Sequence, residues 1–239
     1  MMVFACISPH PPIILPSVGS EEDRKKVKKT ITSLEKLGKQ LAKVKPDCLV
    51  ISSPHPDWGI NVPLYFLSSK LKMKNEKLQF KIQNYSYPNY KLPITNFYPT
   101  VYPVLTTLDS PRQHFDWGKR IIKSLPRAKR GAWIASGDMS HCLKEDGPYG
   151  FNPAGPVFDK KFMELLKKKD IPGILNLDSE LVEGAGECGL RSFCMLLGAL
   201  EASRITWEPK ILSYEYPFGV GYLVADIRIN PNPYPNKPK

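Results

Sequence analysis

Histidine is scarce in this sequence of 239 residues, and three of its four histidines closely follow apolar runs that predict core strands. His10 and His55 each lie between two prolines just after such a run, and His141 lies a few residues after a third. In open α/β sheets, the carboxyl ends of neighbouring strands face one crevice, where ligands bind. Three imidazoles that are far apart in the sequence are therefore expected to converge there.

Metal binding is the chemistry that these histidines suggest. The proline rings beside His10 and His55 stiffen the backbone, which preorganises a ligand. Glu187 offers a carboxylate from the glycine-bracketed loop 184–189, which directly precedes a predicted helix. Two imidazoles and one carboxylate suit Fe(II) and leave positions open for substrate and dioxygen. The alternative is that each histidine is an ordinary hydrogen-bonded loop residue. That interpretation is favoured for any one of them alone, but it does not explain why three of them follow three predicted strands.

The roles of other polar residues near these loops have two possible interpretations. Asp57 and Asp138 each lie within three residues of a candidate histidine. Such carboxylates orient an imidazole and fix its tautomer, or they simply form turns. His114 is different because no predicted strand leads to it. It stands at the start of a predicted helix, which favours a surface or helix-capping role.

The elements that must position these side chains alternate between strand and helix. Core strands are predicted at 3–8, 48–52 and 132–136, helices at 21–44, 116–124, 158–168 and 190–202, and a closing hairpin at 210–216 and 222–229. No element is assigned in the Tyr-, Phe- and Pro-rich stretch 61–107. The opening strand, helix and strand predict parallel strands with a right-handed crossover. We therefore expect a single α/β domain at 1–230, with a mostly parallel central sheet flanked by helices, and an extended Pro-rich tail at 231–239.

Composition and charge exclude several classes of protein. The 34 Lys and Arg exceed the 23 Asp and Glu by 11, but the basic residues form scattered runs without a recognisable nucleic-acid-binding motif. This pattern disfavours a nucleic-acid partner. No apolar run approaches the roughly 18 residues of a membrane span, so no membrane partner is expected. Five cysteines without Cys-x-x-Cys spacing, and a start that makes a poor signal peptide, favour a reducing, cytoplasmic location.

Four motifs, taken in order, resemble those of the class III extradiol ring-cleavage dioxygenases, the LigB-like catalytic subunits. They are Pro-His-Pro after the first strand, Ser-Pro-His-Pro-Asp-Trp after the second, Ser-Gly-Asp-Met-Ser-His, and Gly-Glu-Cys-Gly before a leucine-rich helix. The resemblance spans residue 7 to about residue 221 and implies a LigB-like fold. It also implies that His10, His55 and Glu187 ligate a non-haem Fe(II) and that His141 is the catalytic acid–base.

The resemblance further implies a substrate and partners. It predicts that the ring of a catechol-like small molecule is cleaved with O2, and that His141 moves protons because imidazole titrates near neutral pH. The positive net charge favours an anionic, carboxylated substrate, for which Arg191 is a candidate clamp. Relatives of this kind also suggest a homo-oligomer or a small partner subunit.

Two alternatives remain open. The same superfamily contains Memo-like proteins, in which a Cys-Gly dipeptide takes the place of the third ligand, and here Cys188 directly follows Glu187. A sulfur ligand would favour a Memo-like metal-binding or redox protein that lacks ring cleavage and acts through a protein partner. A hydrolase built on Cys188, His141 and Asp138 is the other alternative, although the sequence has no nucleophile-elbow motif.

Overall fold

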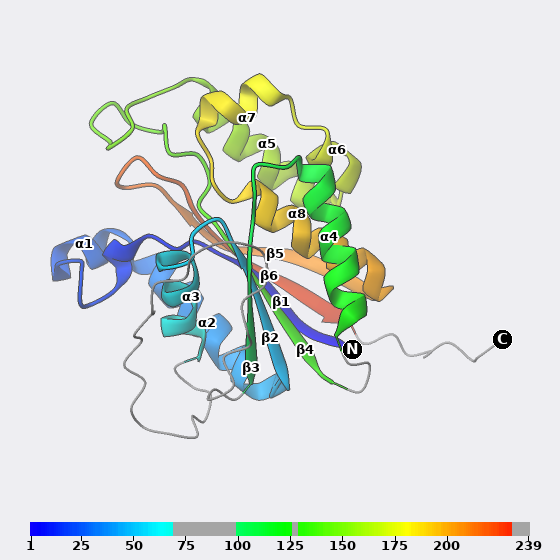
Figure 1. The fold of residues 1–239 in the computed structure, drawn as a ribbon. Helices are drawn as coiled ribbons and strands as arrows, with labels where there is room; N and C mark the ends of the chain where they lie inside the picture. The colour runs from blue at the N-terminus through cyan, green and yellow to red at the C-terminus, as the bar shows by residue number, and fades with distance from the viewer. Residues whose placement is uncertain (69–98, 126–128, 231–239) are drawn as a thin grey trace.

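A six-stranded sheet forms the centre of the molecule in the computed structural model, which describes residues 1–68, 99–125 and 129–230 (Figure 1). The strand order is β3-β2-β4-β1-β6-β5. The strands are β1 (Met2–Ser8), β2 (Cys48–Ser53), β3 (Thr100–Leu105), β4 (Gly131–Ser136), β5 (Thr206–Glu215) and β6 (Tyr222–Asn230). The first four pair in parallel, and β5 and β6 pair antiparallel. The predicted single-domain α/β fold with a mostly parallel sheet is thus confirmed, and the predicted tail at 231–239 lies outside the described residues.

Helices cover both faces of this sheet (Figure 1). They are α1 (Glu21–Lys26), α2 (Lys28–Val44), α3 (Trp58–Ser68), α4 (Pro111–Ser124), α5 (Ala154–Lys168), α6 (Ile171–Leu175), α7 (Ser179–Ala185) and α8 (Leu190–Ser203), with a short 3-10 turn at Pro12–Ile14. Helices α2 and α3 pack on one face, and α4 to α8 pack on the other. The right-handed crossover rule explains why α2, which joins β1 to β2, and α4, which joins β3 to β4, cover opposite faces.

The first face is closed by the amphipathic helix that the sequence predicts. Leu34, Leu37 and Leu41 are fully buried, which the helical spacing of these residues requires. Ser20 caps α1 as expected, because its hydroxyl accepts from the backbone of Asp23 while the Asp23 carboxylate accepts from the backbone of Ser20. The predicted continuous helix is broken at residue 27, however, where the backbone leaves helical geometry and α1 ends.

The second face is closed by α8, which packs against α4. Gly118 and Gly198 mark the contact, since a Cβ atom on Gly198 would lie 1.9 Å from the carbonyl oxygen of Phe115. A Cβ atom on Gly118 would lie 1.8 Å from the carbonyl oxygen of Met195. Only glycine lets the two backbones approach this closely. Helix α8 is thereby held rigidly over β1, β2 and β4, and the loop before it is held at the ends of those strands.

The parallel register brings the functional loops to one edge of the sheet. Ser8 at the end of β1 lies opposite Ser136 at the end of β4, and Ser52 of β2 lies opposite Ala135 of β4. The loops that follow these strands therefore leave the sheet side by side. They carry His10, His55 and His141, which is the arrangement that the strand order of an open α/β sheet favours.

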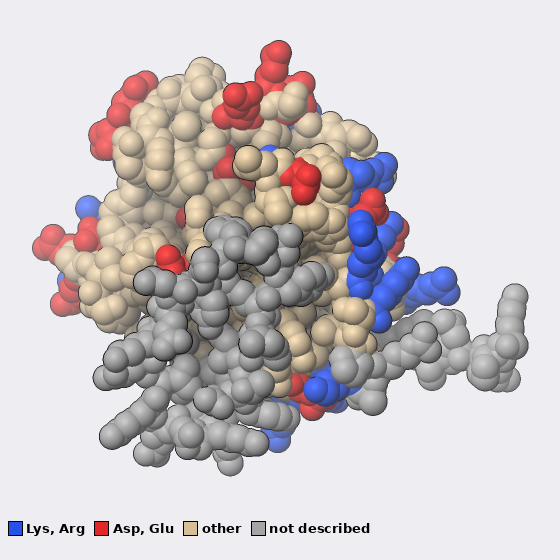
Figure 2. Space-filling model, viewed as in Figure 1, with Lys and Arg blue, Asp and Glu red and all other residues tan. Residues whose placement is uncertain are grey.

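The charged side chains on the face shown in Figure 2 are unevenly distributed. Basic side chains gather on the right-hand side of this view, and acidic ones are more widely spread. Lys119 of α4 is paired, because its Nζ lies 2.9 Å from Glu201 Oε1. Within the described ranges, none of the helices combines the length and the apolar character that crossing a membrane demands.

Candidate metal and active site

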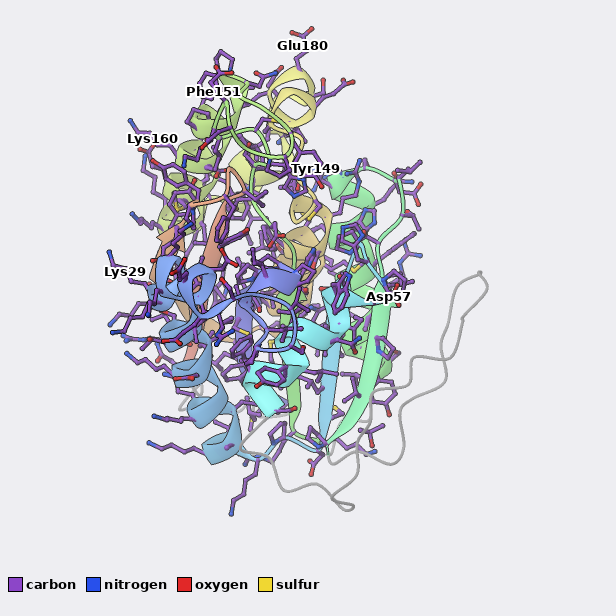
Figure 3. The ribbon with its side chains drawn as sticks, turned by 90° about the vertical axis from the view of Figure 1, so that its left-hand side faces the viewer. Lys29, Asp57, Tyr149, Phe151, Lys160 and Glu180 are labelled. Carbon is purple, nitrogen blue, oxygen red and sulfur yellow. The ribbon has the colours of Figure 1, made fainter. Side chains whose placement is uncertain are left out.

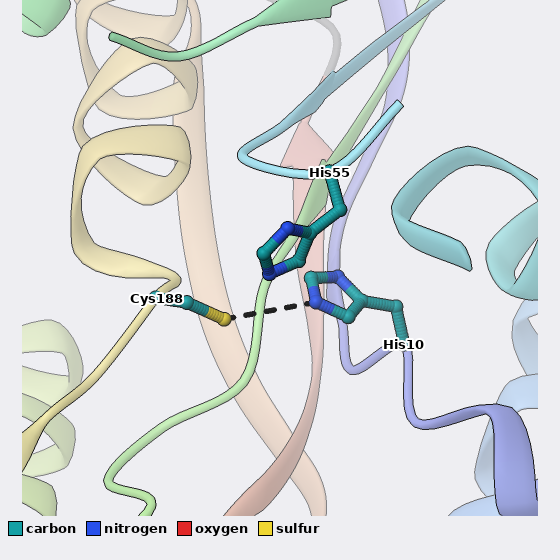
Figure 4. Close-up of side chains that lie close together, drawn as sticks. All are labelled: His10, His55 and Cys188. Carbon is teal, nitrogen blue, oxygen red and sulfur yellow. Dashed lines mark hydrogen bonds between the residues drawn. The ribbon is translucent and has the colours of Figure 1, made fainter. Parts of the chain in front are cut away.

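His10 and His55 face each other across the loops that follow β1 and β2. Their rings meet edge to face, with centroids 5.1 Å apart (Figure 4). His10 is buried and held twice: its Nδ1 lies 2.9 Å from Ser136 Oγ, and its backbone N–H donates to Asp138 Oδ1 over 2.9 Å. The backbone N–H of His55 donates to Ser53 Oγ over 3.1 Å. His55 is exposed, so this pair has one buried and one accessible imidazole.

The sulfur of Cys188 completes this group. It lies 3.6 Å from His10 Nε2, and one ligand atom from each of Cys188, His10 and His55 falls within 4.8 Å of the others (Figure 4). Cys188 also belongs to a second group of the same dimensions, with Asp138 and His141. The backbone N–H of Asp138 donates to the sulfur over 3.3 Å. Imidazole nitrogen and cysteine sulfur are both good ligands for transition metals.

Glu187 lies elsewhere. Its side chain is 2% exposed, and its Oε2 accepts from the backbone N–H of Leu190 over 2.5 Å, in the first turn of α8. Burial raises the pKa of this carboxyl to about 7, an effect that the Leu190 hydrogen bond opposes. Adjacent residues of an irregular loop point in different directions. The structure therefore brings Cys188, rather than the predicted carboxylate, to His10 and His55.

His141 reaches the same space from the loop after β4. Its backbone N–H donates to the carbonyl of Ala185 over 3.1 Å, and its ring packs on Tyr149 with centroids 5.0 Å apart. Its Nε2 is buried and has no hydrogen-bond partner among the described residues. Burial lowers the pKa of His141, and the Asp138 carboxylate partly opposes that shift. A buried nitrogen without a partner is costly, and a bound ligand would satisfy it.

Burial also sets the protonation of the surrounding groups. It lowers the pKa of His10 to about 3, with a further contribution from the nearby His55 ring, so the His10 imidazole is neutral. The contact of His10 Nε2 with Asp138 Oδ2 at 3.9 Å is therefore not an ion pair. Burial raises the pKa of Asp138 to about 6 and raises that of the Cys188 thiol. A bound cation would favour loss of the thiol proton, as metal–thiolate sites require.

A cavity of about 420 Å³ opens beside these groups, within the range of small-molecule sites. His10, His55, Asp138, His141 and Cys188 all line it. Its walls also contain aromatic side chains that the sequence analysis did not single out, namely Trp58, Tyr149, Phe218 and Tyr222. Tyr149 lies on the loop between β4 and α5 (Figure 3). The glycines around Val220 predict a hairpin but not its place in the fold. Phe218 and Tyr222 reach the cavity because β6 of that hairpin pairs with β1.

Two further predicted site residues do not line the cavity. The guanidinium of Arg191 is engaged elsewhere, because its Nε donates to the carbonyl of Asp109 over 2.9 Å and its Nη1 lies 4.0 Å from Glu187 Oε1, so it is not placed as a clamp on a substrate in this cavity. Asp57 is exposed, and its carbonyl accepts from the backbone N–H of Ile60 and Asn61 at the start of α3. The position of Asp57 at the start of α3 agrees with the turn-forming role, and no hydrogen bond in the described structure joins it to a histidine.

His114 is buried rather than at the surface. Its Nε2 accepts from the backbone N–H of Thr107 over 3.1 Å, and its Nδ1 lies 2.9 Å from the carbonyl oxygen of Ser110. The expected link to a helix start is present, since Ser110 is the N-cap of α4. Packing of α4 against α8 covers this position, which an isolated helix would expose.

A close backbone contact joins the loop of Asp138 to the loop of Cys188. A Cβ atom on Gly137 would lie 2.2 Å from the Cα of Gly189, and a Cβ atom on Gly189 would lie 2.8 Å from the carbonyl oxygen of Asp138. Neither backbone has room to yield without displacing the other. Glycine at both positions therefore brings the sulfur of Cys188 to the backbone N–H of Asp138.

We expect Gly137→Ala to lower the free energy of unfolding by about 1–3 kcal/mol, because the added methyl group overpacks this contact. Urea denaturation followed by circular dichroism measures the change. Gly131→Ala is the control at the start of β4, the strand that precedes Gly137, since a Cβ atom on Gly131 would have Cys48 Sγ as its nearest neighbour, at 3.6 Å. It should change stability by no more than about 0.5 kcal/mol. Equal effects of both substitutions would contradict the proposed contact.

Comparisons with known proteins agree with this fold. Protein CA_C1420 from Clostridium acetobutylicum is 34% identical over 266 aligned positions, which cover 92% of this chain and 56% of that protein. The chain thus spans little more than half the length of this curated relative. The crystal structure of the uncharacterized protein JW3007 from Escherichia coli K12 has a similar fold, with a TM-score of 0.56, 15% identity, and coverage of 94% of this chain and 99% of that one. The family model described as the catalytic LigB subunit of aromatic ring-opening dioxygenase matches residues 53–225. Because that match covers well over half of the sequence, the chain belongs to the LigB family.

Proposed function

We propose that this chain is a metal-dependent oxidoreductase that opens the ring of a catechol-type substrate with O2. The observation that carries the proposal is His141 Nε2, a buried nitrogen with no partner in the described structure, in the cavity that the proposed metal ligands also line. A neutral imidazole beside a metal site is suited to accept a phenol proton. The family supports chemistry of this type, and the aromatic walls of the cavity suit a planar ring.

His10, His55 and Cys188 are the proposed metal ligands. They fit a transition metal, because they offer two nitrogen donors and one sulfur donor that lie within 4.8 Å of one another. We propose non-haem Fe(II) as the ion, which would supply Lewis-acid and redox chemistry when bound. Imidazole and thiolate also suit copper and zinc, and the loading experiment therefore includes both.

The surrounding residues prepare these ligands. The hydroxyl of Ser136 forms a hydrogen bond with His10 Nδ1, and His10 Nε2 is thereby directed toward Cys188. The backbone N–H of Asp138 donates to the sulfur and would stabilise its negative charge as a thiolate. Such hydrogen bonds orient ligands and tune their basicity. Trp58 and Tyr149 line the cavity and would exclude water from a bound ring.

Metal loading tests the proposal. The purified protein is incubated anaerobically with Fe(II), Cu(I) or Zn(II), desalted, and analysed for bound metal. We expect about one ion per wild-type chain. Changing a residue that only orients a ligand typically lowers metal affinity about 10-fold to 100-fold. His10→Ala and His55→Ala each remove one of the three ligands, so each should lower the affinity by at least that much. A folded wild-type protein that retains none of these metals would rule out the metal site.

A second candidate is a Memo-like redox protein that lacks ring cleavage and acts with a protein partner. The position of Cys188 favours it, since sulfur occupies the place where ring-cleaving relatives are expected to have a carboxylate. Oxygen uptake by the iron-loaded protein, with catechol and 3,4-dihydroxybenzoate as probes, separates the two. Formation of a yellow ring-opened semialdehyde that contains oxygen from ¹⁸O2 supports the dioxygenase. Bound metal without ring opening supports the second candidate.

A further inference from the structure

Asp159 is a buried carboxylate outside the cavity. It lies on α5 and is 1% exposed. Its Oδ1 accepts from the backbone N–H of Ser140 over 2.8 Å, and its Oδ2 accepts from the hydroxyl of Tyr214 on β5. None of the Lys and Arg side chains in the described structure forms an ion pair with it. Burying a carboxylate costs free energy unless hydrogen bonds compensate. Both oxygens of Asp159 accept such hydrogen bonds, and these also hold Ser140 and Tyr214 in place.

Ser140 directly precedes His141, and the segment around it is held from further directions. The backbone N–H of Gly221 donates to the carbonyl of Ser140 over 2.8 Å, and that of Met139 donates to the carbonyl of Gly221 over 2.8 Å. Ser140 Oγ donates to the carbonyl of Ala185 at the end of α7, also over 2.8 Å. The segment 137–141 is therefore tied to α5, to the start of β6 and to the end of α7.

The fit around Asp159 leaves little room for movement. A Cβ atom on Gly221 would lie 2.5 Å from Asp159 Oδ2, so glycine at this position lets the backbone pass directly beside the carboxylate. Burial raises the pKa of Tyr214 and of Asp159, the latter to about 6. Neither Asp159 nor Tyr214 lines the cavity that Asp138 and His141 line.

We infer that Asp159 and Tyr214 are positioning residues that fix segment 137–141 against the metal site. This inference rests on the proposed function. Through Ser140, the pair sets where the backbone N–H of Asp138 meets the sulfur of Cys188. It also sets where the ring of His141 stands in the cavity. Small displacements of such groups change both the electronic properties of a ligand and the rate of a proton transfer.

The test uses Co(II) as a spectroscopic probe of the sulfur ligand, because thiolate bound to Co(II) gives a charge-transfer band in the near ultraviolet. Loss of Asp159 in Asp159→Ala is expected to shift or weaken this band and to speed Co(II) release about tenfold. Asp159→Asn should restore both to near the wild-type values, since an amide oxygen still accepts from Ser140 and the amide N–H₂ can donate to Tyr214. Tyr214→Phe should give a smaller shift in the same direction.

Asp226→Ala is the control. Asp226 is also a buried carboxylate, 5% exposed, but its contacts are to Gln40 and Arg228. It should lower the melting temperature without moving the Co(II) band, because loss of stability alone does not alter the sulfur ligand. A wild-type protein without the band contradicts the proposed metal site. A wild-type band that is unchanged in Asp159→Ala, in a folded protein, overturns the positioning role and leaves the metal site standing.

Discussion

Cys188→Ser is expected to abolish tight metal binding, lowering the affinity at least about 100-fold. The hydroxyl of serine keeps its proton at neutral pH and is a harder ligand than sulfur. The two remaining imidazoles, of His10 and His55, would then hold the ion alone. Competition with a chromophoric chelator measures the affinity. The Co(II)–sulfur charge-transfer band should disappear in the same variant.

Glu187→Gln is the matched control at the adjacent position. Its side chain accepts from the backbone of Leu190 and does not reach the imidazoles, so metal affinity should stay within about threefold of wild type. The amide should also keep the hydrogen bond at the start of α8. Loss of metal in Glu187→Gln, together with retention in Cys188→Ser, would show that the carboxylate is the third ligand. The sequence-based prediction of Glu187 as a ligand would then be correct.

His141→Ala is expected to lower kcat about 10²-fold to 10⁴-fold while one metal ion per chain remains bound. The ring of His141 lines the cavity, and its Nε2 has no hydrogen-bond partner among the described residues, so its removal takes away the group placed to accept a substrate proton. Steady-state oxygen uptake by the iron-loaded protein measures kcat, and metal analysis of the same sample measures occupancy.

Cys142→Ser provides the neighbouring control for that experiment. Cys142 follows His141 directly, but the contact that its sulfur makes in the described structure is a long one, 4.0 Å, with the carbonyl oxygen of Tyr149. The kcat of Cys142→Ser should stay within about twofold of wild type, as expected for a substitution away from the reacting groups. If His141→Ala kept wild-type kcat, the acid–base role would pass to another titratable group that lines the cavity, such as Asp138.

Much of the architecture could be predicted because the signals are local. Apolar runs mark β1, β2 and β4, the spacing of Leu34, Leu37 and Leu41 marks α2, and Ser20 marks the start of α1. A strand–helix–strand order then permits few topologies, which is why the parallel sheet and the common edge for His10 and His55 follow from the sequence. The stretch containing β3 was not assigned. Its tyrosine and proline residues are half-buried at the sheet edge, so they leave no apolar run.

The site shows where local signals stop. The choice between Glu187 and Cys188 depends on which way two adjacent loop residues face, and the packing of Gly189 against Gly137 decides it. The exposure of His114 likewise depends on α4 packing against α8. Arg191 was predicted to bind substrate from its place beside the Glu187 loop, yet the carbonyl of Asp109, far away in the sequence, takes its Nε.

By itself, the sequence determined the α/β fold, the edge of the sheet that carries the site, and the two proline-flanked histidines, His10 and His55. These follow from periodicity and backbone stiffness, which depend on near neighbours along the chain. Only the tertiary structure decided that Cys188 joins the histidines, that aromatic side chains from distant elements wall the cavity, and that Asp159 holds the loop of His141. These depend on close contacts between segments far apart in the sequence, and no pattern within one segment encodes the direction in which a side chain meets a distant partner.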